Sequence, residues 1–352
     1  MIESILNHKL FRRLSHNIVI DLGTSNSSIT IKNTGIKFSE PSYISYDLRK
    51  KTVIAAGESA KKMLGRTPPY IKVVKPFKEG VIANFEMASF FIEHLLRKIK
   101  NAGILKPQIM TAVPINSSEV ERRALQEALR IAGARSVFLV EQVIASAVGA
   151  DIPIMDAYGG LIADLGYSSC RVAIISLGGI VMYRTTPIAG DSMDEAIASM
   201  MRRKHNLLIG ELSAQELKKQ LGFAVRTEQE KFVMVKGRDI STGLPSCAEV
   251  SSEDVFSAIS DCLKNIMELV KSCIELAPHE LISDIIEKGI TISGGISCLR
   301  GIDRFLSERL NVKCVIAPDP LFSVALGMEK IINDSHLMNS LFAGGKDRIN
   351  EF

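Results

Sequence analysis

Two polar turns of one design contain the residues best suited to chemistry. Residues 21–26 (DLGTSN) follow an apolar run, and residues 164–169 (DLGYSS) follow another about one domain length later. Glycine lets a backbone approach a ligand without a Cβ, and successive N–H groups in such a turn form a nest for an anion. The neighbouring hydroxyl and amide side chains add hydrogen-bond donors. Each turn is therefore predicted to bind phosphate oxygens.

An aspartate begins each turn, and a third glycine turn accompanies them. Asp21 and Asp164 are carboxylates of the kind that hold a hydrated Mg²⁺, which usually keeps several waters. Gly294 and Gly295, after an apolar run from residue 289, let a nucleoside lie close to the backbone. One such turn alone is usually an ordinary hairpin, but three of similar design favour a nucleotide site. The predicted ligand residues are Asp21, Gly23, Thr24, Ser25, Asn26, Asp164, Gly166, Tyr167, Ser168, Ser169, Gly294, Gly295 and Ile296, with Asp21 and Asp164 holding the metal through water.

The sequence around each of the first two turns predicts a strand–turn–strand hairpin. Residues 17–32 contain two apolar strands joined by the first turn, and residues 161–177 repeat that arrangement. The repetition indicates an internal duplication with one hairpin in each half. The third turn ends another apolar strand, over residues 289–293.

An α/β unit lies between the two hairpins. An apolar run over residues 109–113 is followed by Ser118 and Glu121, which form a capping box that begins an amphipathic helix ending near Gly133. The next strand, over residues 137–140, is separated from the first by this helix. A strand–helix–strand connection of this length predicts parallel pairing.

The second of these strands delivers Glu141 and Gln142 at its carboxyl end, where ligands gather in open α/β sheets. Residues 37–80 and roughly 190–257 interrupt the α/β pattern, one segment in each half. The predicted fold class is therefore α/β, with two duplicated domains that each carry a smaller inserted subdomain and a ligand cleft between them.

The composition excludes several classes of protein. The chain has 352 residues, a formal net charge of +4 and no dense basic stripe with interleaved aromatic residues, so nucleic-acid binding is not predicted. Its six cysteines include no CxxC pair, and its six histidines show no ligand spacing. Buried free thiols in a reducing compartment are expected. No apolar run approaches the ~18–20 residues of a membrane span, and no secretory signal is evident. We expect a cytoplasmic protein.

The first fourteen residues form a short basic amphipathic pattern that can lie in a membrane interface. The alternatives are a helix packed on the domain or a frayed tail. Phe90 and Phe91 are a second candidate for membrane contact, although a role in a helix core is favoured for both. The predicted membrane-contacting residues are Ile2, Ile5, Leu6, Leu10 and Phe11.

Several motifs resemble those of the MreB/Mbl family, the bacterial branch of the actin superfamily. They are DLGTSN at 21–26, GI at 35–36, EPS at 40–42, MLGRTP at 63–68, GVIA at 80–83, VERRA at 120–124, GRD at 237–239 and GLP at 243–245. The resemblance extends from about residue 17 to residue 330. It implies an actin-like ATPase fold, ATP or ADP with Mg²⁺ in the cleft, and polymerisation of the protein with itself into paired protofilaments. It also implies a peripheral location at the inner face of the cell membrane. There such a protein organises cell-wall synthesis, with other MreB paralogues and cell-wall-elongation membrane proteins as partners.

The resemblance also implies domain boundaries. An N-terminal amphipathic segment covers residues 1–14. Subdomain IA covers 15–36, 81–150 and 325–345; subdomain IB covers 37–80; subdomain IIA covers 151–187 and 258–324; and subdomain IIB covers 188–257.

Further site residues follow from the same resemblance. Glu141, Gln142 and Ser169 stand at the catalytic positions, with Gln142 in place of the glutamate that positions the attacking water. Gln215 and Lys218 lie where the family reaches the ribose, and Gln215 replaces a family glutamate.

The second turn departs from the family pattern, which is Asp-Ile-Gly-Gly-Gly-Thr-Thr-Glu. Two of its glycines are replaced by Tyr167 and Ser168, which narrows backbone freedom where a phosphate approaches. Cys170 and Arg171 replace the last threonine and the glutamate. Hydrolysis therefore has to be demonstrated for this chain.

Three other departures leave the predicted pocket in place. Gln142 cannot accept a proton as a carboxylate does, although it can orient water by hydrogen bonds, and actin has glutamine at this position. Ser293 replaces a threonine before the third glycine turn, and Asn84 replaces an aspartate near the base of the cleft.

Three functions compete. The first is an ATP-binding filament protein at the membrane with slow or regulated ATP hydrolysis. The second is a nucleotide-binding paralogue that does not hydrolyse and that co-assembles with, or regulates, a competent MreB-type filament. The third is a small-molecule kinase or a chaperone on the same superfold. The third is disfavoured because only about twenty residues follow the last shared motif and no substrate-binding acidic loop stands out.

Overall fold

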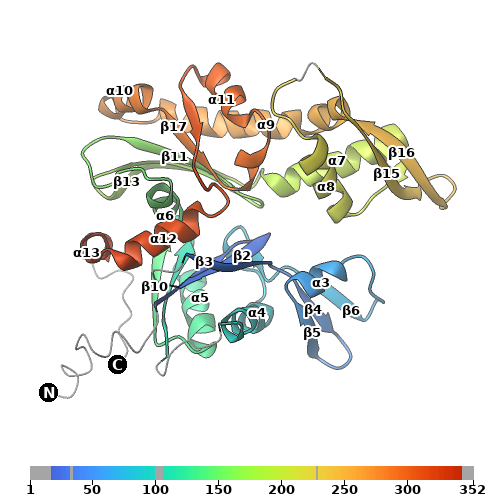
Figure 1. Ribbon diagram of the computed structural model, residues 1–352, viewed down its shortest axis with the longest axis horizontal. Coiled ribbons are helices and arrows are strands. Elements are labelled where there is room, and N and C mark those ends of the chain that lie inside the picture. The colour runs from blue at the N-terminus through green and yellow to red at the C-terminus, as the bar shows by residue number, and fades with distance from the viewer. Residues whose placement is uncertain (1–16, 32–34, 100–105, 227–228, 343–352) are drawn as a thin grey trace. The chain divides into compact units, whose positions relative to one another are not determined.

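The computed structural model describes residues 17–31, 35–99, 106–226 and 229–342, which form two compact units (Figure 1). Residues 1–152 and 322–352 belong to the first unit, and residues 153–321 belong to the second. Each unit contains a five-stranded sheet and a hydrophobic core of its own. The amphipathic segment predicted over residues 1–14 lies outside the described residues.

The sheet of the first unit has the order β10-β9-β1-β2-β3. β1 pairs antiparallel with β2 and parallel with β9, and β9 is parallel to β10. The predicted hairpin and the predicted parallel strand–helix–strand unit are both confirmed. The strands are β1 (Asn17–Leu22), β2 (Asn26–Ile31), β3 (Ile36–Pro41), β9 (Gln108–Val113) and β10 (Ser136–Glu141).

The helix between β9 and β10 is α5 (Glu119–Ile131), and it begins with the predicted capping box. The hydroxyl of Ser118 accepts a hydrogen bond from the N–H of Glu121, and the Glu121 carboxylate accepts one from the N–H of Ser118. This reciprocal pair satisfies two backbone donors that the first turn of a helix otherwise leaves unpaired. The unit also contains α4 (Phe85–Arg97), α6 (Gln142–Gly149), α12 (Ser323–Asn333) and α13 (Ser335–Phe342).

Two glycines let α6 and α12 pack at backbone distance. A Cβ on Gly327 would lie 1.7 Å from the carbonyl oxygen of Ala145, and a Cβ on Gly149 would lie 1.8 Å from that of Ser323. Neither position tolerates a side chain without displacing a helix. The contact fixes α6, which directly follows β10 and whose first residue is Gln142.

A smaller sheet is inserted after β3. It has the order β5-β4-β6, and a two-stranded ribbon of β7 and β8 follows it. The insertion was predicted to begin at residue 37, whereas β3 pairs with β2 and continues the large sheet. The elements are β4 (Ile44–Asp47), β5 (Thr52–Ala56), α3 (Glu58–Lys62), β6 (Ile71–Val74), β7 (Phe77–Lys78) and β8 (Val81–Ile82).

The sheet of the second unit has the order β13-β12-β11-β17-β18. β11 pairs antiparallel with β12 and parallel with β17, so it occupies the place of β1 in the first sheet. The strand order and directions confirm the predicted internal duplication. The strands are β11 (Gly160–Leu165), β12 (Cys170–Ser176), β13 (Gly179–Thr186), β17 (Ile290–Ser293) and β18 (Cys314–Ile316).

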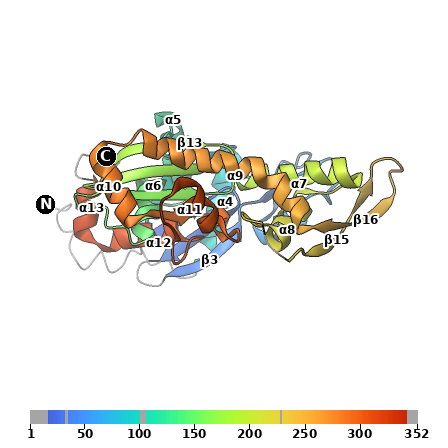
Figure 2. The same cartoon turned by 90° about the horizontal axis from the view of Figure 1, so that it is seen from above.

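The longest described helix of the second unit, α9 (Ser252–Glu275), contacts both the large sheet and the inserted segment (Figure 2). It packs on β12 and β13, and on α7 and α8 of the insertion. The insertion contains α7 (Gly190–His205), β14 (Leu207–Leu208), α8 (Glu211–Leu221), β15 (Phe232–Asp239) and β16 (Pro245–Ser251). After α9 come α10 (His279–Lys288), the short 3₁₀ helix η1 (Gly295–Cys298) and α11 (Ile302–Leu310).

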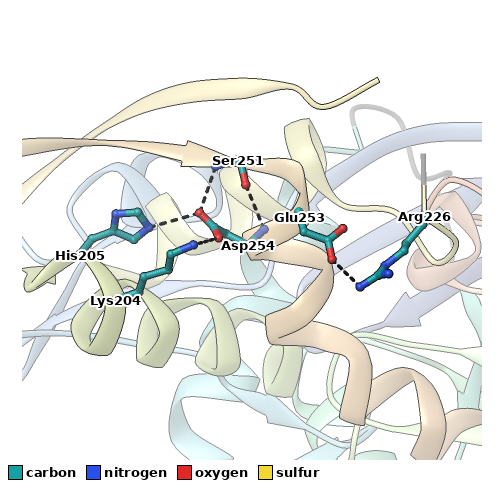
Figure 3. A network of polar contacts seen from close by, with 6 residues as sticks. All are labelled: Lys204, His205, Arg226, Ser251, Glu253 and Asp254. Carbon is teal, nitrogen blue, oxygen red and sulfur yellow. Dashed lines mark hydrogen bonds and ion pairs between the residues drawn. The ribbon is translucent and has the colours of Figure 1, made fainter. Parts of the chain in front are cut away.

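A polar network joins the end of α7 to the start of α9 (Figure 3). Ser251 and Asp254 form a capping box, and the Asp254 carboxylate also pairs with Lys204 and lies 3.4 Å from His205 Nε2. Burial acts against the charge of Asp254, but the hydrogen bonds from Lys204 and Ser251 outweigh it, so the pKa of Asp254 is lowered. On the outer side, Arg226 pairs with Glu253 at 2.9 Å.

Two predictions about single side chains need correction. Phe91 is fully buried in the core, as predicted, but Phe90 is 41% exposed, because neighbouring residues of a helix point about 100° apart. All six cysteines are free thiols, yet Cys247 and Cys298 are exposed where buried thiols were expected. Within the described ranges, no helix is long and apolar enough to cross a membrane.

Candidate functional site

The first glycine turn is a four-residue loop with a backbone that excludes any side chain at its first position. Leu22 and Ser27 are the last paired residues of the hairpin, so residues 23–26 form the loop. A Cβ on Gly23 would lie 2.4 Å from the carbonyl oxygen of Asn26. Thr24 is buried and Asn26 is exposed, and the Asn26 amide donates to Ser25 Oγ at 3.3 Å.

A serine that follows β3 supports the first turn. The Ser42 hydroxyl donates to the Gly23 carbonyl at 2.6 Å, and the Ser42 N–H donates to the Ser25 carbonyl at 3.0 Å. Ser42 Oγ also lies 2.8 Å from Ser27 Oγ in the buried interior. These hydrogen bonds tie the turn to the chain segment that leads into the inserted sheet.

The second glycine turn has the same length and the same glycine position. Leu165 and Cys170 are its last paired residues, so residues 166–169 form the loop. A Cβ on Gly166 would lie 2.7 Å from the carbonyl oxygen of Ser169, to which the Gly166 N–H donates at 3.1 Å. Tyr167 therefore stands where the first turn has Thr24. Ser168 and Ser169 are both buried, at 5% and 8% exposure.

Buried charges flank the second turn. Asp164 is 3% exposed and stands opposite Arg171, itself 4% exposed, in the antiparallel register of β11 and β12. Residues directly opposite in such a pair have Cβ atoms about 5 Å apart, on the same face. The Ser293 hydroxyl donates to Asp164 Oδ1 at 3.4 Å, so the serine that replaces a family threonine still contacts the acid. Burial raises the pKa of the Cys170 thiol, which is thus kept neutral.

The third glycine turn packs against the start of the second. Gly294 has a φ of +83°, and a Cβ there would lie 2.4 Å from the carbonyl oxygen of Leu165. This requirement for glycine arises from packing inside the unit. At Gly295 the nearest atom to a Cβ is 3.9 Å away, so this position is open. Ile296, the third predicted residue of the turn, is buried at 5% exposure.

The Tyr167 side chain crosses the start of α7 and reaches the start of α8. Its ring lies beside Gly190, where a Cβ would be 3.3 Å from both Tyr167 Cα and Cδ2. Its hydroxyl donates to Glu211 Oε1 at 3.0 Å, and it also has a hydrogen bond with the Asp194 carboxylate. The Tyr167 carbonyl accepts a hydrogen bond of 2.7 Å from the N–H of Asp191. Glu211 and Gly190 were not predicted from the sequence, because neither belongs to a turn motif.

A buried ion pair lies against the same ring. Lys218 Nζ is 2.8 Å from Asp194 Oδ1 and 5.6 Å from the centroid of the Tyr167 ring, and it also donates to the Gly190 carbonyl. Burial raises the pKa of Asp194 and lowers the pKa of Lys218, while the partner's charge opposes each shift. Lys218 was predicted to bind the nucleotide, and in the structure its amine contacts groups of its own unit. Gln215, one turn earlier, is partly buried.

The predicted catalytic pair lies where β10 meets α6. Glu141 Oε1 is 3.3 Å from Arg122, whose Nε donates to Ser117 Oγ at 3.0 Å. Gln142 is the first residue of α6. Asn84 caps α4 by accepting the N–H of Met87 at 3.0 Å. Because aspartate and asparagine cap helices about equally well, this departure from the family preserves a structural role.

The chain matches the family model described as MreB/Mbl protein over residues 15–340. The chain belongs to the MreB/Mbl family. It is 38% identical to the cell shape-determining protein MreB of Escherichia coli strain K12, over 92% of this chain and 95% of that protein. It is 35% identical to the cell shape-determining protein Mbl of Bacillus subtilis strain 168, over 89% of this chain and 94% of that protein.

Solved structures agree with this MreB/Mbl assignment. MreB 5 of Spiroplasma citri bound to AMPPNP superposes with a TM-score of 0.88 at 32% identity, over 94% of this chain and 99% of that one. A MamK double helical filament superposes with a TM-score of 0.76 at 20% identity, over 90% of this chain and 99% of that one, which shows the shared actin-like fold alone. The predicted family and fold class are confirmed.

The predicted metal site and the finer domain boundaries remain predictions. In the described part of the chain, no group of three or more His, Cys, Asp or Glu side chains is placed to hold a metal ion. Asp21 and Asp164 therefore stay predicted ligands of a hydrated ion.

Proposed function

We propose that this protein binds ATP or ADP with Mg²⁺ and assembles into filaments at the inner face of the cell membrane, where it organises cell-wall synthesis. The observation that carries nucleotide binding is the pair of four-residue glycine turns, equal in length and glycine position, in a member of the MreB/Mbl family. The Spiroplasma citri relative has been solved bound to ADP and to AMPPNP, which supports the same ligand class here.

The residues present fit a polyphosphate. Each turn begins with a glycine at which a Cβ would clash with a carbonyl oxygen, and such glycine turns can present backbone N–H groups to an anion. Thr24 and Ser25 supply hydroxyls in the first turn, and Ser168 and Ser169 supply them in the second. Asp21 and Asp164 would hold the hydrated Mg²⁺, which neutralises phosphate charge when bound. Gly294, Gly295, Ile296, Gln215 and Lys218 remain the proposed contacts on the nucleoside side.

Hydrolysis is proposed to be slow, with Gln142 orienting the attacking water. A glutamine can hold water by hydrogen bonds but cannot take its proton. Glu141, the neighbouring acid, is engaged by Arg122 at 3.3 Å, so it is not a ready substitute for the missing base. The hydroxyl of Ser169 is proposed to contact phosphate.

Phosphate release tests this part of the proposal. We expect slow but measurable release by the wild type, an increase of about tenfold for Gln142→Glu, and loss for Gln142→Ala. Gln220→Glu adds the same charge on the exposed face of α8 and should leave the rate unchanged. ADP and AMPPNP binding by the wild type without any release would favour the second candidate, a non-hydrolysing paralogue. The replacements at Tyr167, Ser168 and Gln142 are the observations behind that candidate.

Filament formation is tested by sedimentation and electron microscopy with ATP, with ADP and without nucleotide, in the presence of anionic vesicles. We expect ATP-dependent filaments with a longitudinal repeat of one subunit. A protein that stays monomeric on lipid with ATP contradicts the filament proposal. Flotation of a variant lacking residues 1–14 tests the membrane segment, and unchanged vesicle binding would assign that role to another surface.

A further inference from the structure

We infer that Tyr167 is a positioning residue that holds the second glycine turn in its phosphate-binding shape before nucleotide arrives, through the hydrogen bond from its hydroxyl to Glu211. The inference rests on the proposed nucleotide binding. Tyr167 replaces a glycine of the family pattern, and on this inference the replacement has a function.

The geometry ties the turn to two helices at once. The Tyr167 carbonyl accepts the N–H of Asp191 in the first turn of α7, at 2.7 Å. The hydroxyl at the other end of the residue donates to Glu211 in the first turn of α8, at 3.0 Å. Between these two bonds the ring lies on Gly190, whose missing side chain leaves the space that the ring occupies. Backbone and side chain of one residue thus anchor the turn at separate places.

The two charged residues beside the ring, Lys218 and Asp194, are held by contacts of their own. Lys218 is 14% exposed at its side chain and Asp194 only 3%, and the two form an ion pair of 2.8 Å. The Lys218 amine also donates to the carbonyl of Gly190 and faces the Tyr167 ring at 5.6 Å. A cation over an aromatic face adds attraction, more so where water is partly excluded. Tyr167 therefore rests on groups that are fixed by their own contacts.

The consequence concerns the entropy of binding. A turn of three successive glycines samples many backbone conformations and loses that freedom when it closes on phosphate. A turn with an anchored tyrosine and two buried serines has lost most of this backbone freedom on folding. Preordering a binding loop raises affinity because the ordering cost is no longer met at the binding step. The effect should appear for ligands that contact the turn, which are those with phosphates.

The experiment compares three probes on matched variants: ADP, AMPPNP and adenosine, by calorimetry or fluorescence competition. Tyr167→Phe removes one hydroxyl and keeps the ring, so we expect ADP and AMPPNP to bind about three- to tenfold more weakly. Because the Tyr167 hydroxyl also has a hydrogen bond with the Asp194 carboxylate, Glu211→Ala should weaken binding less than Tyr167→Phe does. The double variant should be no worse than Tyr167→Phe, and Glu211→Gln should bind nearly as the wild type does. Tyr167→Gly, which restores the family residue, should lose more than Tyr167→Phe. Adenosine affinity should not change in any of them.

Tyr183→Phe is the control, since it removes a hydroxyl from a partly exposed tyrosine on β13 of the same unit. Unchanged ADP affinity in Tyr167→Phe and Glu211→Ala overturns the inference, as does tighter binding by Tyr167→Gly, which would show that the tyrosine obstructs the site. An equal loss for adenosine would instead make the pair a nucleoside contact and also overturn it. Failure of the wild type to bind any probe contradicts the proposed function itself, a different result.

Discussion

The two units contain the same sheet and the same glycine hairpin, but they support that hairpin differently. In the first unit, Ser42, which follows β3, donates hydrogen bonds to the carbonyls of Gly23 and Ser25. In the second unit, Tyr167 reaches out of the turn to α7 and α8. In both cases the support comes from the segment inserted after the large-sheet strands.

The difference separates what a duplicated fold must keep from what it can change. The loop length and its first glycine are kept because a Cβ at that place would meet a carbonyl oxygen in either unit. The support is free to change because any group that satisfies the turn from outside will serve.

The largest expected effect concerns the packing of α6 on α12 in the first unit. Gly327→Ala puts a Cβ 1.7 Å from a backbone oxygen, so it should lower the free energy of unfolding by about 3 kcal/mol. Urea unfolding measures it. Gly210→Ala is the control, since no atom lies within 4 Å of a Cβ there. Equal stability of the two variants would mean that the helices part easily and that α6 does not fix Gln142.

Ser42 and the Lys218–Asp194 ion pair beside the Tyr167 ring should contribute unequally to stability. Lys218→Met leaves the carboxylate of Asp194 buried without its cation and should cost about 3 kcal/mol, whereas Ser42→Ala should cost only about 1 kcal/mol. The double variant Lys218→Met with Asp194→Leu should recover much of the loss, because a pair of apolar groups replaces a pair of charges. Thermal unfolding distinguishes the variants. Comparable costs for the two single changes would contradict the proposed contrast.

Gly23 and Gly166, the first glycines of the two turns, should respond alike to substitution. Gly23→Ala and Gly166→Ala each introduce a contact under 3 Å with the fourth residue of the loop, so each should cost about 2 kcal/mol and weaken ADP binding, with Gly23 the more sensitive. Melting temperature and ADP affinity are measured together on both variants. A large effect at one glycine and none at the other would break the equivalence of the turns.

The smallest effect is a pH dependence specific to the second unit. The folded-state pKa of Asp254 is lowered from 3.8, so its ionised form stabilises the fold above about pH 4 and that contribution is lost as the pH falls further. Melting temperatures at pH 7 and pH 3 should therefore differ less for Asp254→Asn than for the wild type. Asp261→Asn, on the exposed side of α9, should follow the wild type. If the melting temperature of Asp254→Asn falls between pH 7 and pH 3 as much as that of the wild type, the acid sensitivity belongs to other groups.

The features predicted correctly from the sequence are those with local causes. A glycine after an apolar strand, a capping box before an amphipathic helix and a helix between two apolar runs are short-range patterns. They correctly predicted the two hairpins, α5 and the parallel pairing of β9 with β10. The start of the insertion depends on which strands pair, and a local pattern does not record strand pairing, so most of β3 was assigned to the insertion. Phe90 was misjudged because apolar character alone does not set the face of a helix.

The sequence by itself determined the family, the duplication and the three glycine turns, because these depend on residue identity and spacing along the chain. Only the tertiary structure decided what Tyr167 does. Its partners Gly190, Glu211 and Lys218 lie on two helices of the insertion, and Glu211 is 44 positions away in sequence. No periodicity records such a contact, because it arises when the folded insertion brings the ends of α7 and α8 beside the turn. The tyrosine that narrows the turn in sequence is, in space, the residue that holds it.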